Sequence, residues 1–281
     1  MTGVRLKERV GFSLLFLAIM LVVIPVILIL WLIISKGWTA ITWEFLLTMP
    51  RNGMRAGGIF PAIIGTFYLV LGSIAFSLPV GVMAAIYLNE YAKDNLLTRL
   101  INLAIINLAG VSSVVYGLFG LSLFVVFFRF GVSIISGSLT LGIMTLPVII
   151  TTTREALRAV PRSFREVSVS LGTTRWQTIR HAVLPFALPG ILTGAILSIG
   201  RVAGETAPIL FTVAAFYLPN LPHSIFDQAM ALPYHLYIIS TQIPNIRQDY
   251  RYGTALVLVG LVLIMNISAI IIRSKFRKKR W

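Results

Sequence analysis

The sequence predicts an all-α, polytopic membrane protein with six transmembrane helices. Of its 281 residues, 57% are hydrophobic and 12% are charged, and the mean hydropathy is +0.90. A soluble chain of this length needs far more charge to cover its surface. The apolar residues form continuous runs, such as residues 10–34 without one charged side chain, and about 20 residues suffice to cross a bilayer core. Because these runs do not alternate with polar residues, they favour helices over barrel strands.

Six spans follow from the apolar runs. The first is too long for the core of a signal peptide and lacks a small-residue cleavage site, so we expect it to be retained. The fourth has only 16 residues and contains Pro147, so we expect it to tilt against its neighbours or to be buried by them. The spans are expected at residues 10–35, 59–89, 99–128, 138–153, 186–215 and 252–273.

The distribution of Lys and Arg predicts the orientation. Seventeen of the 24 Lys and Arg residues lie in the termini and loops of one side, six lie on the other side, and Arg201 falls inside a span. Because cytoplasmic loops carry the basic excess, both termini are predicted to be cytoplasmic. The excess of Lys and Arg on the cytoplasmic side then accounts for most of the net charge of +15. Attraction of these residues to membrane lipid is a second effect. No nucleic-acid partner is expected.

The composition limits the chemistry that this chain can carry. The absence of cysteine excludes disulfides, thiolate metal sites and a cysteine nucleophile, and we expect no metal, cofactor or catalytic residue.

Two long external connections, 36–58 and 216–251, either dock another protein or form interfacial aromatic belts and turns. The expected parts are a cytoplasmic N-terminus at 1–9, the first span with its external loop at 10–58, a core of five spans at 59–273 with the cytoplasmic loop 154–185, and a basic cytoplasmic tail at 274–281.

A short amphipathic helix is predicted inside the cytoplasmic loop, over residues 162–171. Pro161 suits the start of a helix, where its missing N–H costs nothing, and Gly172 can end it. A helix of about ten residues is unstable alone in water, so its apolar face needs a surface. Periodicity leaves three surfaces open, namely lipid headgroups, the chain itself or a groove of another protein. That face carries Phe164, Val167, Ser168 and Leu171 at helical spacing.

The same loop resembles the EAA loop of ABC importer permeases. The family pattern is a Glu, two small residues, a Gly six positions after the Glu, and a Leu-Pro pair past a nine-residue gap. Matching positions are Glu166, Gly172, Leu184 and Pro185, whereas Val167, Ser168 and Ala182 depart from it. The resemblance implies a type I ABC importer permease fold, in which this helix couples to a groove of the ATP-binding subunit. The coupling residues it implies are Phe164, Glu166, Val167, Leu171 and Gly172.

ATP hydrolysis is not expected of this chain itself. The sequence contains no GxxxxGK[ST] loop for nucleotide phosphates. An importer of this kind would therefore draw on a separate ATP-binding subunit.

A charged pair lies deep in the fifth span. Arg201 follows Pro185 by 16 residues, about 24 Å along a helix, and an Arg at that depth costs at least about 2.5–3.5 kcal/mol. Glu205 follows at i+4, close enough to pair. We expect Pro208 to bend the helix and free the carbonyl of Gly204, beside the Thr206 hydroxyl. Either the pair locks helices together, or Arg201 attracts an anion through its forked donors while Glu205 holds it in place.

Residues 201–212 resemble the signature of the phosphate-specific (Pst) importer permeases of the PstA type. Residues 109–120 resemble the third-span segment of that family, with Ser112 where a Pro is usual, and residues 231–237 resemble its last external loop. The resemblance implies a pathway in a prokaryotic plasma membrane that includes Arg201 and Glu205. It also implies a second, PstC-type permease, two ATP-binding subunits and an external phosphate-binding protein. Thr206, Ser112 and Ser113 are further candidates for the pathway, although hydroxyls in spans also bond to backbone or to neighbouring helices.

Several function classes remain open. A permease for another oxyanion, such as molybdate or sulfate, fits the same residues, because one Arg does not encode the identity of the anion. An intramembrane enzyme would need a catalytic pair, yet the sequence has no HExxH, no GxSxG and no second buried acid near Glu205. A secondary transporter would show internal inverted repeats, which are not evident, and would leave the 162–171 helix without a role.

Overall fold

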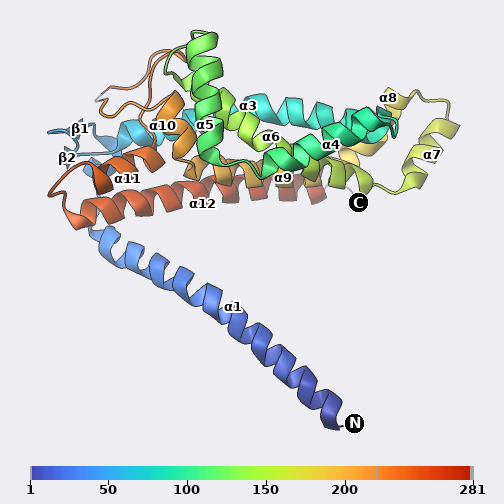
Figure 1. Cartoon of the computed structure of the whole chain (residues 1–281), viewed down its shortest axis with the longest axis horizontal. Coiled ribbons are helices and arrows are strands. Elements are labelled where there is room, and N and C mark those ends of the chain that lie inside the picture. The colour runs from blue at the N-terminus through green and yellow to red at the C-terminus, as the bar shows by residue number, and fades with distance from the viewer. Residues whose placement is uncertain (1, 219, 279–281) are drawn as a thin grey trace.

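The computed structural model describes residues 2–218 and 220–278, which fold almost entirely into helices (Figure 1). The first part of the chain comprises α1 (Thr2–Gly37), η1 (Trp38–Ala40), α2 (Trp43–Leu47), β1 (Pro50–Arg51), β2 (Ala56–Gly57), α3 (Phe60–Ile86) and the π-helical segment η2 (Tyr87–Tyr91). The middle comprises α4 (Leu96–Ala109), α5 (Ser113–Gly120), the π-helical segment η3 (Leu121–Phe127), α6 (Ile134–Arg158) and α7 (Arg162–Ser170). The last part comprises α8 (Arg175–Thr178), the π-helical segment η4 (Ile179–Val183), α9 (Leu184–Gly204), α10 (Ala207–Thr212), α11 (Leu232–Thr241) and α12 (Gln248–Lys278).

Within the described residues, five helices are long and apolar enough to cross a membrane. A sixth span is formed by α4 together with α5 and η3, which meet at a bend of 106°. The span predicted at 99–128 is therefore sharply bent and is not one continuous helix. The chain leaves the helical conformation at Ser112, whose ψ is 144°, so the bend forms here without the Pro usual in the resembling family.

The fourth span is longer than predicted. Instead of 16 residues, α6 has 25 and runs through Pro147 without a break. Two thirds of its most apolar window is buried inside the protein, so it does not need a continuous apolar surface toward lipid. Neighbouring helices bury much of this span, as expected, whereas its predicted bounds, 138–153, were too narrow.

Close packing of α3, α6 and α9 forms the centre of the bundle. A Cβ atom at Gly72 of α3 would overlap the Ser138 hydroxyl of α6, and one at Gly194 of α9 would overlap the side chain of Thr152 on α6. Small residues at such positions allow membrane helices to approach closely. The helix α6 therefore packs closely against both α3 and α9.

The helix α1 leans away from this bundle (Figure 1). Its last residue, Gly37, lies against the backbone of Tyr252 at the start of α12, and its apolar side chains are largely exposed, including Leu21 and Trp31. The predicted parts 1–9 and 274–281 continue their neighbouring helices, since α1 begins at Thr2 and α12 extends to Lys278. Residues 279–281 of the predicted tail lie outside the described residues.

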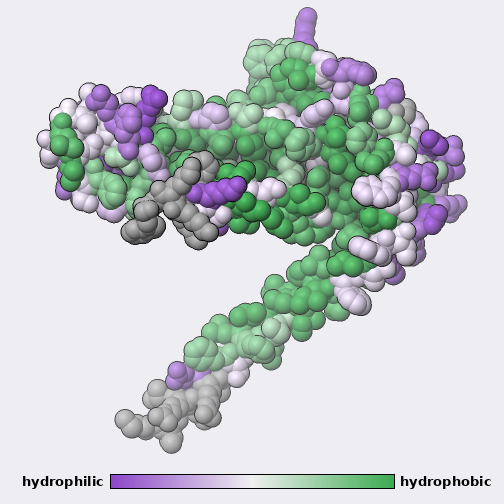
Figure 2. All heavy atoms as spheres, turned by 180° about the vertical axis from the view of Figure 1, so that it is seen from behind, coloured by the Kyte–Doolittle hydropathy of each residue, from purple (hydrophilic) through white to green (hydrophobic). Residues whose placement is uncertain are grey.

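The two ends of the bundle carry different elements. Figure 1 places α7, α8 and the end of α12 together, which we call the α7 end, and places β1, β2 and α11 at the opposite end, which we call the hairpin end. The start of α1, well away from the bundle, and the end of α12 point toward the same side as the α7 end in Figure 1. Figure 2 shows a hydrophobic belt between hydrophilic residues gathered at these two ends, the pattern that a bilayer-spanning protein requires.

Candidate translocation site and α7 surface

The fifth span is broken next to its charged pair. The helix α9 ends at Gly204, Glu205 is extended with φ −75° and ψ 137°, and α10 begins at Ala207. The predicted bend at Pro208 is thus a complete break, located three residues earlier. The Pro ring would clash with the carbonyl of Gly204 in a continuous helix, whereas in the first turn of α10 its missing N–H costs nothing.

Arg201 and Glu205 are only loosely paired across this break. The Arg201 Nε atom lies 3.5 Å from Glu205 Oε1, and the two side chains are 33% and 20% exposed. This distance is the outer limit of a hydrogen bond. The two terminal guanidinium nitrogens, Nη1 and Nη2, have no hydrogen-bond partner among the described residues. The half-buried guanidinium group of Arg201 therefore has N–H donors that are available to a bound anion.

The other pathway candidates lie at two helix breaks. Thr206 occupies the gap before α10 and makes no capping bond with its side chain. Ser112 and Ser113 lie at the α4–α5 bend, and in the described part of the chain neither hydroxyl bonds to Arg201 or Glu205. The structure thus joins Arg201 with Glu205 but does not bring the two serines into hydrogen-bond contact with them.

The two breaks face each other because α5 packs on α10. A Cβ atom at Gly117 would come within 3.1 Å of the Ala207 carbonyl oxygen and the Pro208 Cα atom. One residue earlier, the Tyr116 hydroxyl donates to the Leu108 carbonyl at 2.9 Å across the α4–α5 bend. Tyr116 was not among the predicted site residues, although it is close enough to Arg201 to interact with its charge.

Gly200 and Gly204, which lie one turn apart beside the charged pair, have different surroundings. Gly200 lies against Asn266 of α12, whose side-chain nitrogen would be 3.2 Å from an added Cβ atom. Gly204 has open space at that position. Within the described chain, close helix approach therefore occurs at Gly200, whereas Gly204 leaves room for another helix.

The helix α7 forms where the sequence predicted it. Pro161 precedes it in an extended conformation, Leu171 ends it, and Gly172 follows with φ +80°, a left-handed conformation that glycine adopts at little cost. Phe164, Val167 and Leu171 remain 42%, 61% and 78% exposed. These side chains line an open hollow of about 420 Å³ together with Ser163, Ser168 and Ala182.

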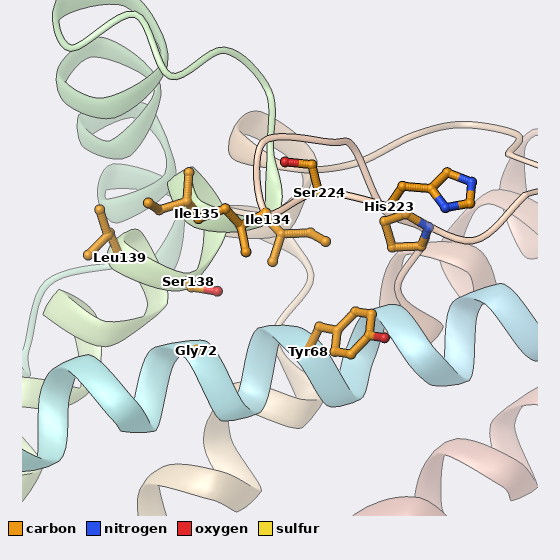
Figure 3. Close-up of a pocket in the computed structure, with 10 residues that line it drawn as sticks. Tyr68, Gly72, Ile134, Ile135, Ser138, Leu139, His223 and Ser224 are labelled. Carbon is orange, nitrogen blue, oxygen red and sulfur yellow. The ribbon is translucent and has the colours of Figure 1, made fainter.

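A second hollow lies at the hairpin end and differs in chemistry. Its volume is about 350 Å³, and Figure 3 shows Tyr68 of α3 and Ser138 of α6 on its walls, with His223 on the loop above. No Lys or Arg lines it, so an anion would find no countercharge there. This hollow is therefore a weaker candidate for an anion-binding site than the surroundings of Arg201.

Comparison with known proteins decides the family. Residues 77–280 match the family described as "Binding-protein-dependent transport system inner membrane component". The chain is 35% identical to the phosphate transport system permease protein PstA 1 of Mycobacterium tuberculosis (strain ATCC 25618 / H37Rv), over 98% of this chain and 90% of that protein. The chain belongs to the PstA-type ABC transporter permeases. A further relative is the probable ABC transporter permease protein YqgI of Bacillus subtilis (strain 168), 36% identical over 84% of this chain and 85% of that protein.

Solved structures show the same fold. The alginate ABC transporter in complex with its pentasaccharide-bound periplasmic protein matches with a TM-score of 0.69 and 15% identity, over 94% of this chain and 93% of that chain. The inward-facing MetNI methionine transporter matches with a TM-score of 0.60 and 18% identity, over 78% of this chain and 94% of that chain. The type I importer permease fold, implied by the EAA resemblance, is confirmed. This PstA-type permease is a multi-pass protein of a prokaryotic plasma membrane, and permeases of its family work with partner subunits.

Proposed function

We propose that this permease forms half of the translocation pathway of an ATP-driven importer of inorganic phosphate. The observation that carries the proposal is the open guanidinium fork of Arg201 at a helix break inside the fifth span. A planar fork of N–H donors matches the oxygens of a tetrahedral oxyanion. The relatives named for phosphate transport at 35% identity support phosphate as the anion.

Glu205 offers a reason for choosing phosphate over other oxyanions. Inorganic phosphate retains at least one P–OH proton at neutral pH, whereas sulfate and molybdate retain none. A carboxylate accepts hydrogen bonds but donates none when ionised. Glu205, 3.5 Å from Arg201, can therefore accept from phosphate bound at the fork and repels an anion that lacks a proton.

The remaining parts of the machine are other subunits. We propose a PstC-type permease for the other half of the pathway, two ATP-binding subunits that hydrolyse ATP, and an external phosphate-binding protein that delivers the substrate. The exposed apolar face of α7 suits the groove of an ATP-binding subunit, because Phe164, Val167 and Leu171 project from it. The α7 end and both termini then face the cytoplasm. Closure of the ATP-binding subunits pushes α7 and opens the Arg201 site alternately to each side.

Uptake of labelled phosphate, sulfate and molybdate tests the proposal. The chain is expressed with its partner subunits in cells without their own phosphate permeases, as wild type, as Arg201→Gln and as Arg129→Gln. Arg129 is an exposed loop residue and serves as the matched control. We expect phosphate-selective uptake that only Arg201→Gln abolishes, with the complex intact. Uptake of another oxyanion would overturn the substrate, and dissociation of the complex by Arg201→Gln would favour a structural ion pair.

A further inference from the structure

A partly buried ion pair joins three helices at the α7 end. The Arg165 side chain of α7 donates from Nη2 to Glu90 Oε1 at 2.7 Å and from Nε to Glu90 Oε2 at 3.2 Å. Glu90 lies in η2, the continuation of α3, and its side chain is 12% exposed, against 24% for Arg165. Bidentate pairs of this kind are stronger and more directional than single contacts.

The same guanidinium also holds the end of α6. Arg165 donates from Nη2 to the Leu157 carbonyl and from Nη1 to the Val160 carbonyl, each at 3.0 Å. Leu157 belongs to the last turn of α6 and Val160 is the second residue beyond it, a region where a cation is favoured by the helix dipole. Four of the five N–H donors of Arg165 are thereby used, unlike the open fork of Arg201.

The pair is positioned by a local departure from α-helical geometry. Residues 87–91 form a π-helical turn, whose extra residue rotates Glu90 from the place that a regular α-helix would give it. Asn89 adds a further hydrogen bond to Glu90 Oε1 at 2.8 Å. Single π-turns inside α-helices occur frequently at functional sites.

The rest of α7 is attached in a different way. The Phe164 ring packs on Phe186 of α9 with ring centroids 5.1 Å apart, and the rest of the apolar face is open. Ser168 bonds to Thr173 and Thr178, which hold α7 to the turn before α9. Residues 175–204 form one continuous helical stretch. Through its own chain, α7 can therefore move α9, whereas its polar attachment to α3 and α6 is made by Arg165.

We infer that the Arg165–Glu90 pair makes α7 and the ends of α3 and α6 move as one body, so that a push on α7 displaces the whole bundle and not α9 alone. This positioning role rests on the proposed function, because it assumes that an ATP-binding subunit pushes α7. Loss of the pair leaves docking and ATP hydrolysis in place, but a push on α7 then displaces α9 alone, against its packing on α6, and drives the rearrangement at Arg201 less efficiently.

The test measures phosphate imported per ATP hydrolysed in the assembled, reconstituted complex. The variants are Glu90→Gln, Arg165→Gln and the double variant, with Glu155→Gln and Arg180→Gln as controls, because Glu155 and Arg180 are exposed and have no side-chain partner in the described part of the chain. We expect the ratio to fall at least about tenfold in both single variants, as for loss of a charge-assisted hydrogen bond. The double variant should fall no further, and the controls should keep the wild-type ratio.

A merely stabilising pair would give another pattern. It would lower the amount of assembled complex and leave the ratio in the surviving complexes unchanged, which would overturn the inference. So would additive losses in the double variant. If the wild type imports another oxyanion, the proposed substrate fails, but the same ratio measured with that anion still tests the pair.

A covalent replacement gives an independent test. The chain contains no cysteine, so Glu90→Cys/Arg165→Cys introduces its only two thiols, and cysteine-free partner subunits are used. A reversible bifunctional thiol reagent should restore the transport ratio, and reduction should remove it again. Inhibition by the cross-link would show that α7 must move relative to α3, contrary to the inference.

Discussion

Truncation of Leu171 tests the proposed docking of α7 most directly. Its side chain is 78% exposed, so Leu171→Ala removes apolar surface without opening a cavity in the permease. Complete burial of a Leu side chain contributes about 1.5–3 kcal/mol. Since roughly four fifths of it is exposed here and Ala retains a methyl group, docking in a groove should lose about 1–2 kcal/mol. That loss weakens binding of the ATP-binding subunit about five- to thirtyfold.

The assay is the Kd between the purified permease pair and the ATP-binding subunit. Val169→Ala is the matched control, because Val169 lies on the same helix and is 56% exposed, but does not line the hollow beside Phe164 and Leu171. We expect Val169→Ala to leave the Kd within about twofold of wild type. Equal weakening by both variants, or an unchanged Kd for Leu171→Ala, would refute a groove that contacts this face.

Three further changes probe the pathway, the loop and the hairpin end. Glu205→Gln should reduce the preference for phosphate over sulfate, measured by competition in uptake, because an amide does not repel an unprotonated anion. Gly172→Pro should uncouple ATP hydrolysis from transport without reducing membrane insertion, since the φ of +80° is closed to Pro; normal coupling would contradict this. Burial lowers the pKa of His235 to about 4. Because the folded-state pKa lies below the unfolded value of about 6.5, the free energy of unfolding is highest above about pH 6.5 and falls as the pH drops toward 4. The loss is about 2 kcal/mol at pH 5. His235→Leu should remove this pH dependence, measured by thermal unfolding.

Local patterns made part of this molecule predictable. The runs of apolar residues predict six spans, because each helix that crosses the bilayer needs its own apolar run of about 20 residues. Pro161 and Gly172 predict α7, because helix ends depend on nearby residues. Tertiary contacts decided the rest. The serines and threonines in α6 lower its apolarity, yet neighbouring helices bury them. Glu90 and Arg165 are 75 residues apart in sequence, so periodicity could place Arg165 away from the apolar face but could not name its partner.

The break after α9 explains how a motion at α7 could change the site. The continuous stretch 175–204 carries Arg201 about 40 Å from the α7 end, at 1.5 Å per residue. Beyond Gly204 the chain turns into α10, which packs on α5 and accepts at the Thr212 carbonyl a hydrogen bond from the Ser133 N–H at the start of α6. Under the proposed coupling, Arg201 shifts with α9, α3 and α6 as one body, while Thr206 lies beyond the break and is carried by α10. A helix continuous to residue 215 would carry both together, so the break converts displacement of a rigid helix into a change in the spacing of groups around the anion.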